Sequence, residues 1–243
     1  MTTIFIDKTA MCAAARSGRT TARLESTSVR TTAHIALLFA AATGLTTLTA
    51  APATAETITT IDSGHVDVFG VAFEDGAFHL HVHDEAAAAE YEPSEVLLVA
   101  KSAARTSVPA DPAYGFLGTP GAPVWVLPQV QDPDLLWPGI AAEEIEPGIF
   151  TEGTLKLKVE CVRGPGDFSI FTTDAVGAPT VLVDSGDGLP DRIELTAGGH
   201  QHANWAFEAA GTYTVTVRAA GVLAATGQKV VSESATYRLK VNR

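Results

Sequence analysis

The stretch VDVFGVAFEDGAFHLHVHDE, residues 66–85, decides the fold of this chain. Apolar residues alternate with other residues on both sides of Asp75-Gly76, and alternation with a period of two is typical of a half-buried strand. Asp-Gly between two such runs predicts a β-hairpin with a two-residue turn. A hairpin is therefore expected here, with one apolar face turned toward a core.

The same turn predicts the pairing register. If Asp75-Gly76 forms the turn, Glu74 lies opposite Ala77, and the pairing can be extended along both strands. That register sets Asp67 opposite Asp84, Val68 opposite His83, and His65 near Ala86.

Further strand-like runs follow along the chain: 95–100, 154–162, 168–172, 180–184, 204–207, 212–219 and 236–241. Residues 107–150 are rich in proline and glycine and separate the first of these runs from the rest. Trp125 and Trp137 lie in this stretch, and flexible linkers rarely contain tryptophan. We therefore expect the stretch to be an ordered excursion. Many short strands with frequent turn residues predict an all-β fold. We expect a single antiparallel β-sandwich, Ig-like or jelly-roll-like, over residues 56–243.

The N-terminal part has the layout of a secretory signal peptide. An apolar run, IALLFAAATGLTTL at residues 35–48, follows several arginines and precedes Ala53-Thr54-Ala55. Its length of about 14 residues is too short to span a bilayer as a helix. We therefore expect residues 1–55 to be a signal peptide with an N-terminal extension, and the mature chain to be secreted without a transmembrane anchor.

The charge balance limits the possible partners. The chain has 28 acidic and 16 basic residues, and a formal net charge of −12. Such a surface repels phosphate backbones, so nucleic-acid binding is not expected.

The histidines are the strongest functional signal. Three of them alternate with apolar residues in the second hairpin strand, so His79, His81 and His83 would share the face opposite to the core. Neutral imidazole is the commonest ligand for transition metals in proteins. Residues two apart on a strand lie roughly 6.5–7 Å apart, so two of the three, with His79 and His81 preferred, are expected to bind one ion.

The remaining ligands should come from elsewhere in the chain. His200 and His202 form a second His-x-His near a strand start, and His65 precedes the first hairpin strand. We expect His79, His81, His200 and His202 to be ligands, with His83 and His65 as further candidates. Three acidic residues could orient the imidazoles by accepting hydrogen bonds, or bind as oxygen ligands: Asp67, Asp84 and Glu85.

The donor set leaves the metal open. Nitrogen coordination suits zinc, copper or nickel, whereas carboxylate ligands move the preference toward manganese. Zinc is the first expectation, and affinity should weaken below about pH 6, because protonated imidazole cannot bind a metal.

Two other classes of function stay open. A solvated strand face would also carry alternating histidines, and the chain would then be a non-catalytic interaction or adhesion module that presents its proline- and tryptophan-rich excursion to a cell-surface partner. No nucleophile elbow, His-Glu-x-x-His motif or phosphate-binding glycine loop is found in the sequence, so an enzyme is not expected.

Several motifs together resemble a known family. They are GHVDV (64–68), HLHVHDE (79–85), FLG (116–118), PVWVLPQ (123–129), LWPG (136–139), GHQHANWAF (199–207) and GTY (211–213). They are similar to the actinobacterial surface-anchored repeat domain associated with metal ABC transporters, also called the choice-of-anchor M domain. The resemblance spans about residues 60–220, and its closing histidine motif is the most specific part.

This resemblance implies an extracytoplasmic protein that works beside an ABC-type metal importer, with zinc or manganese as the metal. The combined expectation is a secreted accessory protein that captures or buffers a transition metal for such an importer. The family's surface anchor is not carried over, and retention at the surface through a partner is expected instead.

Overall fold

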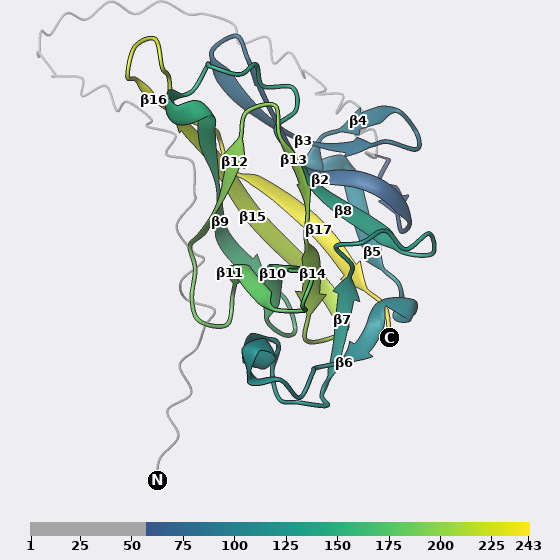
Figure 1. Cartoon of the computed structure of the whole chain (residues 1–243). Coiled ribbons are helices and arrows are strands. Elements are labelled where there is room, and N and C mark those ends of the chain that lie inside the picture. Colours follow the sequence, from purple (N-terminus) through teal and green to yellow (C-terminus); the bar gives the residue numbers. More distant parts are fainter. Residues whose placement is uncertain (1–56) are drawn as a thin grey trace, which may run out of the picture.

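The computed structural model describes residues 57–243, and the predicted signal peptide lies outside this range. The described residues are mostly strand, which confirms the all-β prediction. They form three sheets (Figure 1), each with its own strand order. Four short 3-10 helices lie among the connections: η2 (Pro93–Glu95), η3 (Ser102–Ala104), η4 (Pro112–Leu117) and η5 (Thr151–Gly153).

The large sheet has the order β1-β5-β17-β15-β9-β12, with β16 paired to β15. Its strands are β1 (Thr59–Ile61), β5 (Val96–Ala100), β9 (Thr154–Arg163), β12 (Asp191–Thr196), β15 (Gly211–Val222), β16 (Lys229–Val231) and β17 (Ala235–Val241).

The antiparallel sheet has the order β11-β10-β14-β7-β6. Its strands are β6 (Arg105–Ser107), β7 (Pro123–Leu127), β10 (Phe168–Thr173), β11 (Pro179–Asp184) and β14 (Asn204–Phe207).

The histidine sheet has the order β13-β8-β2-β3-β4. Its strands are β2 (Gly64–Glu74), β3 (Ala77–Asp84), β4 (Ala89–Tyr91), β8 (Leu136–Ala141) and β13 (His200–His202). Because β13 runs on into β14 after a single residue, one chain segment links this sheet to the antiparallel sheet (Figure 1).

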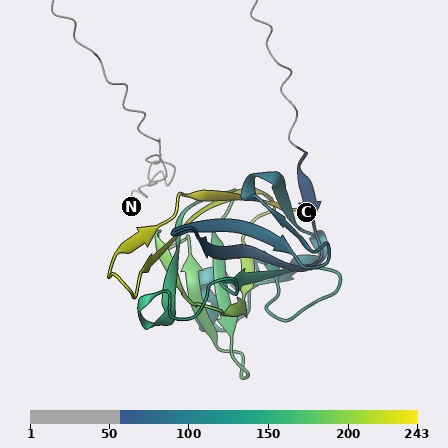
Figure 2. The same cartoon turned by 90° about the horizontal axis from the view of Figure 1, so that it is seen from above.

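One apolar core is shared by all three sheets. Phe69 of β2 packs against Trp205 of β14 with ring centroids 4.7 Å apart, and against Tyr237 of β17 at 4.9 Å. All three side chains are buried in the same cluster. Seen from above, the β2–β3 hairpin crosses the rest of the molecule (Figure 2), so its apolar face covers one end of the core.

The hairpin is confirmed, and its register is confirmed in part. Asp75 and Gly76 both have positive φ, as a two-residue turn of this kind needs, and pairing runs as predicted from Glu74–Ala77 to Gly70–His81. The register then shifts by one residue between Asp67 and Gly70, so that Asp67, rather than Val68, lies opposite His83.

A β-bulge at Val68 and Phe69 causes this shift. Both side chains are fully buried, although neighbours on a regular strand point to opposite faces. The extra residue, Val68, leaves Val66 in the core and returns Asp67 to the histidine face.

The prediction of purely antiparallel pairing is wrong for three strand pairs. β1–β5, β5–β17 and β2–β8 are parallel. A parallel pair needs a long crossover connection, and the predicted excursion belongs to the crossover between β2 and β8. The excursion also contributes β7 and β8 to two different sheets, and a single two-sheet sandwich is not confirmed.

Residues 57–243 contain no helix of the length and apolarity that a bilayer crossing requires.

Candidate metal centre

All six histidines within the described residues lie on one face of the histidine sheet. On β2 and β3 this follows from the alternation, because Val66, Leu80 and Val82 fill the opposite face and are buried in the core. The short strand β13 pairs antiparallel with β8 and adds His200 and His202 to the same face. The sheet therefore has one apolar face and one face lined with imidazoles.

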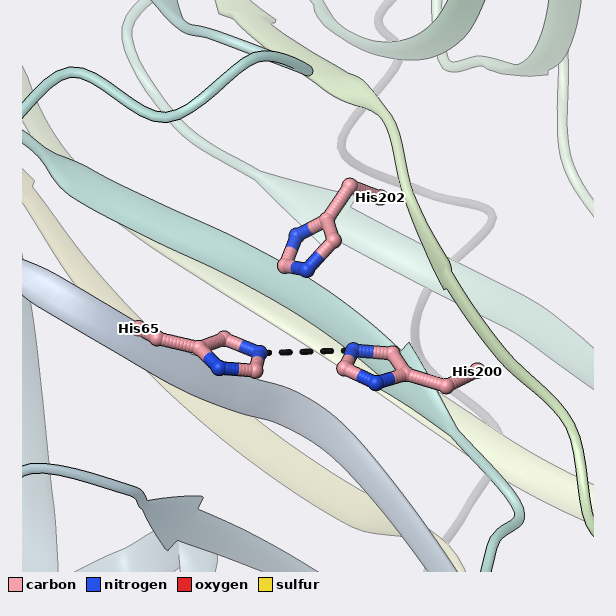
Figure 3. Close-up of side chains that lie close together, drawn as sticks. All are labelled: His65, His200 and His202. Atoms are coloured by element: carbon pink, nitrogen blue, oxygen red, sulfur yellow. Dashed lines mark hydrogen bonds between the residues drawn. The ribbon is translucent and has the colours of Figure 1, made fainter.

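Three of these histidines converge from strands far apart in sequence. His65 of β2 and His200 of β13 point toward each other, and the ring of His202 is directed at the space between them (Figure 3). The two Nε2 atoms of His65 and His200 are 3.3 Å apart, and each of the three histidines offers a nitrogen within 4.8 Å of the other two. Their ring centroids are 4.8 to 5.0 Å apart.

Asp67 adds a carboxylate to this group. Its Oδ1 lies 3.2 Å from Nε2 of His65 and 3.0 Å from Nε2 of His200. A tetrahedral zinc ion with bonds of about 2.0–2.1 Å has ligand atoms about 3.3–3.4 Å apart. The triangle formed by the two nitrogens and the oxygen is therefore close in size to one face of a zinc coordination tetrahedron.

The ring of His202 is held in one orientation. Its Nδ1 donates a hydrogen bond to the Pro138 carbonyl oxygen at 3.0 Å, and its ring stacks on Trp137 with centroids 3.6 Å apart. The Trp137 indole N–H in turn donates to the Gln129 carbonyl oxygen. With Nδ1 protonated, Nε2 carries the lone pair, and metal-binding histidines are commonly fixed in this way.

Burial shifts the pKa values of both His202 and Asp67. Burial lowers the pKa of His202 to about 4, so its imidazole is unprotonated near pH 7. Burial raises the pKa of Asp67, whose side chain is only 3% exposed, while His200 and His65 oppose this rise. A cation would replace the lost solvation of these groups.

Gly139 of β8 makes room for the group. A Cβ atom at this position would overlap Oδ1 of Asp67 and come within 2.8 Å of Nε2 of His200. β8 lies between β2 and β13, so the two side chains meet above this strand. Only glycine allows them to approach over its backbone.

The histidines of β3 are arranged differently. His79 lies 3.0 Å from Glu92, His81 lies 3.2 Å from Glu144, and His83 lies 3.7 Å from Glu85, each measured from a ring nitrogen to a carboxylate oxygen. Among the described residues, the groups that could hold an ion do not combine any of them with His200 or His202. The structure thus joins His200 and His202 to His65, and not to His79 and His81 as the sequence analysis expected.

The three acidic residues named from the sequence have different surroundings. Asp67 contacts the converging histidines, and it also forms a group with His83 and Glu85 within the same 4.8 Å limit. Asp84 accepts hydrogen bonds from the Ala86 and Ala87 backbone amides and so closes the turn after β3.

Sequence reasoning missed three glutamates, Glu90, Glu143 and Glu144, and two glycines that leave room for the imidazoles, Gly70 and Gly139. Glu143 lies 3.5 Å from Nδ1 of His200, and Glu144 contacts His81. Both lie in the turn after β8, which backbone hydrogen bonds from Ala142 to Gly199 and from Ile145 to Ala142 hold beside β13. The adjacent Glu143-Glu144 pair was a visible signal, whereas Gly70 and Gly139 could not be recognised without the sheet order.

Comparisons of this chain with protein-family models, with curated proteins and with solved structures gave no match.

Proposed function

We propose that this chain binds a single transition-metal ion, zinc in the first place, through His65, His200, His202 and Asp67. The observation that carries the proposal is the triangle of His65 Nε2, His200 Nε2 and Asp67 Oδ1, with sides of 3.0 to 3.3 Å. Neutral imidazole nitrogens and an ionised carboxylate all present lone pairs. Three converging lone pairs repel each other unless protons or a cation lie between them.

Three nitrogens and one oxygen favour zinc over manganese, because imidazole suits zinc and copper whereas manganese prefers oxygen ligands. Copper(II) prefers a square-planar or tetragonal arrangement. The ligand atoms of His65, His200 and Asp67 are instead spaced as on one face of a tetrahedron. Manganese and copper remain the competitors to be measured against zinc.

A role in holding metal fits this ligand set better than catalysis. Catalytic zinc sites keep a position for water beside three protein ligands, whereas four protein ligands complete a tetrahedron. The His65 and His200 side chains are 22% and 20% exposed, so an ion can enter and leave without unfolding of the core. This combination supports capture or buffering of a metal ion.

The place of action is proposed from the sequence. The signal-peptide pattern before residue 56 supports export, and the resemblance of the histidine motifs to domains associated with metal importers supports a partner of that type. The chain would then take up zinc outside the membrane and pass it to, or store it for, an ABC-type importer.

Calorimetric titration of the purified full chain with Zn²⁺, Mn²⁺ and Cu²⁺ tests the site. We expect one tightly bound zinc per chain, and at least a hundredfold loss of zinc affinity in His65→Gln and in His202→Gln. The matched control is His79→Gln, an exposed histidine on the same face, and this variant should bind zinc as the unaltered chain does. Equal zinc affinity in all four proteins would overturn the proposal.

A second readout separates metal capture from adhesion. Binding to importer components should depend on zinc and disappear in chelator. Cell-surface binding that survives both chelator and His65→Gln would instead favour the interaction module.

A further inference from the structure

A second group of ligand atoms lies on the same face, away from His65, His200 and His202. His81 of β3, Glu90 of β4 and Glu144 of the turn after β8 each offer one ligand atom, and these atoms lie within 4.8 Å of one another. Nε2 of His81 is 3.2 Å from a carboxylate oxygen of Glu144. Three separate segments of the chain thus meet at one imidazole.

His81 is the buried centre of this group. Its side chain is 3% exposed, and its Nδ1 has no hydrogen-bond partner among the described residues. A buried polar nitrogen without a protein partner is uncommon in native proteins. Gly70 lies under the ring, and a Cβ atom there would overlap it, so the sequence leaves space for this imidazole as Gly139 does for Asp67 and His200.

Neither neutral form of His81 is satisfied by the protein alone. With the proton on Nε2, the Nδ1 lone pair is buried without a donor. With the proton on Nδ1, the Nε2 lone pair faces the Glu144 carboxylate at 3.2 Å. In the second form, a cation between Nε2 and the two carboxylates removes the repulsion between these lone pairs.

A cavity of about 110 Å³ lies beside His81 and Glu144. A cavity of this size is large enough to hold ordered water. Asp67 and His83 also line it, and Asp67 belongs to the zinc site proposed above. The cavity therefore connects the two groups of ligands.

We propose that His81, Glu90 and Glu144 form a second site, which takes a divalent cation of the manganese type with the remaining positions filled by water. One nitrogen and two carboxylate oxygens are harder ligands than the three imidazoles, and carboxylate and water ligands suit manganese. The site goes beyond the proposed function, because it shares no ligand with the zinc site.

The test is a titration of the full chain with Mn²⁺ after loading with one equivalent of Zn²⁺, with free Mn²⁺ followed by electron paramagnetic resonance. We expect one Mn²⁺ bound per chain. Glu144→Gln should weaken Mn²⁺ binding at least about tenfold, and His81→Gln should do the same. Because Glu144 is 42% exposed, its replacement leaves the core intact and does not confuse ligand loss with unfolding.

The controls separate the two sites. His79→Gln removes a histidine on the same face that contacts Glu92 and whose ring centroid lies 5.6 Å from that of His81. It should weaken Mn²⁺ binding far less than Glu144→Gln does. His202→Gln, without added zinc, should still bind one Mn²⁺ although its zinc affinity is reduced. Absence of Mn²⁺ binding in the unaltered chain, or equal binding in Glu144→Gln and His79→Gln, would overturn the second site whatever the zinc results are.

Discussion

The two ends of the histidine face use the same side chain in different ways. On β3, three histidines follow each other along a single strand, and each ring nitrogen contacts a different glutamate. Across β2 and β13, three histidines meet, and two of their ring nitrogens are 3.3 Å apart. The denser sequence motif therefore gives the more dispersed arrangement.

The strand between the ligands explains this difference. Side chains on one strand stand side by side and point in the same direction, so a row of histidines has no common point. β2 and β13 are separated by β8, at roughly 10 Å for two strand spacings, and their histidines lean inward from both sides. Gly139 on β8 leaves that space open. Convergence thus needs two flanking strands and a glycine between them.

The largest expected effect is the loss of zinc binding when His65 is replaced and the histidines of β3 are left unchanged. Zinc at 100 times its dissociation constant should stabilise the full chain by about 2.7 kcal/mol, and the gain should disappear in His65→Gln. Thermal unfolding with and without zinc measures it. His79→Gln should keep the full gain, and loss of the gain in that variant would show that the row, and not the convergence, holds the metal.

Replacing Gly139 or Gly70 by alanine tests the two groups of histidines separately, because each glycine lies beneath a different group. Gly139→Ala should lower the free energy of unfolding by about 1–3 kcal/mol, because the new methyl group overlaps Asp67, and zinc affinity should fall with it. Gly70→Ala displaces His81 instead, so it should cost similar stability and keep zinc binding. Denaturant unfolding and calorimetry on both variants check this, and equal zinc loss in the two would contradict the role given to Gly139.

Acid should weaken the metal-free fold through His202. Its pKa is about 4 in the folded chain against an ordinary value of 6.5, so between these values the unfolded chain takes up a proton that the folded chain does not. The free energy of unfolding should therefore fall as pH drops from about 6.5 to about 4, by roughly 1–2 kcal/mol after allowance for partial exposure. Urea unfolding across this range should show a smaller fall in His202→Gln, and an identical fall would assign the effect to other groups.

The smallest expected effect is a modest loss of zinc affinity when the Trp137 ring, which stacks on His202, is removed. Trp137→Leu removes the ring on which His202 stacks at 3.6 Å, and an aromatic contact of this kind contributes about 0.5–1.5 kcal/mol. Zinc affinity should fall between about twofold and tenfold, as measured by competition with a chelating dye. A matched change at Tyr114, which lies near Phe116 and Phe171, should leave zinc affinity unchanged.

The sequence predicted the local structure well and the long-range structure less well. Asp75-Gly76 determines its own turn, so the pairing from Glu74–Ala77 to Gly70–His81 could be predicted. The bulge at Val68 and Phe69 could not, because an extra residue leaves no mark in a run where Val66, Val68 and Phe69 are all apolar. That one-residue shift also carries Asp67 opposite His83.

The same limit applies to the site. The histidines were recognisable from the sequence as possible ligands, and the structure brings His200 and His202 together with His65 instead of with His79 and His81. Which histidines meet depends on the order β13-β8-β2, which includes a parallel pair that local patterns do not specify. Glu143 reaches His200, and Glu144 reaches His81, only because the turn after β8 is bonded to Gly199 beside β13.

In the proposed zinc site, three imidazoles from two separated strands share one ion. X-ray absorption spectroscopy of the full chain loaded with one equivalent of zinc can count them, because scattering from imidazole rings reports the number of histidine ligands. We expect a four-coordinate ion with bonds of about 2.0–2.1 Å and three histidines, reduced to two in His202→Gln. A spectrum with one histidine or none, or one that is unchanged in His202→Gln, would rule out this site.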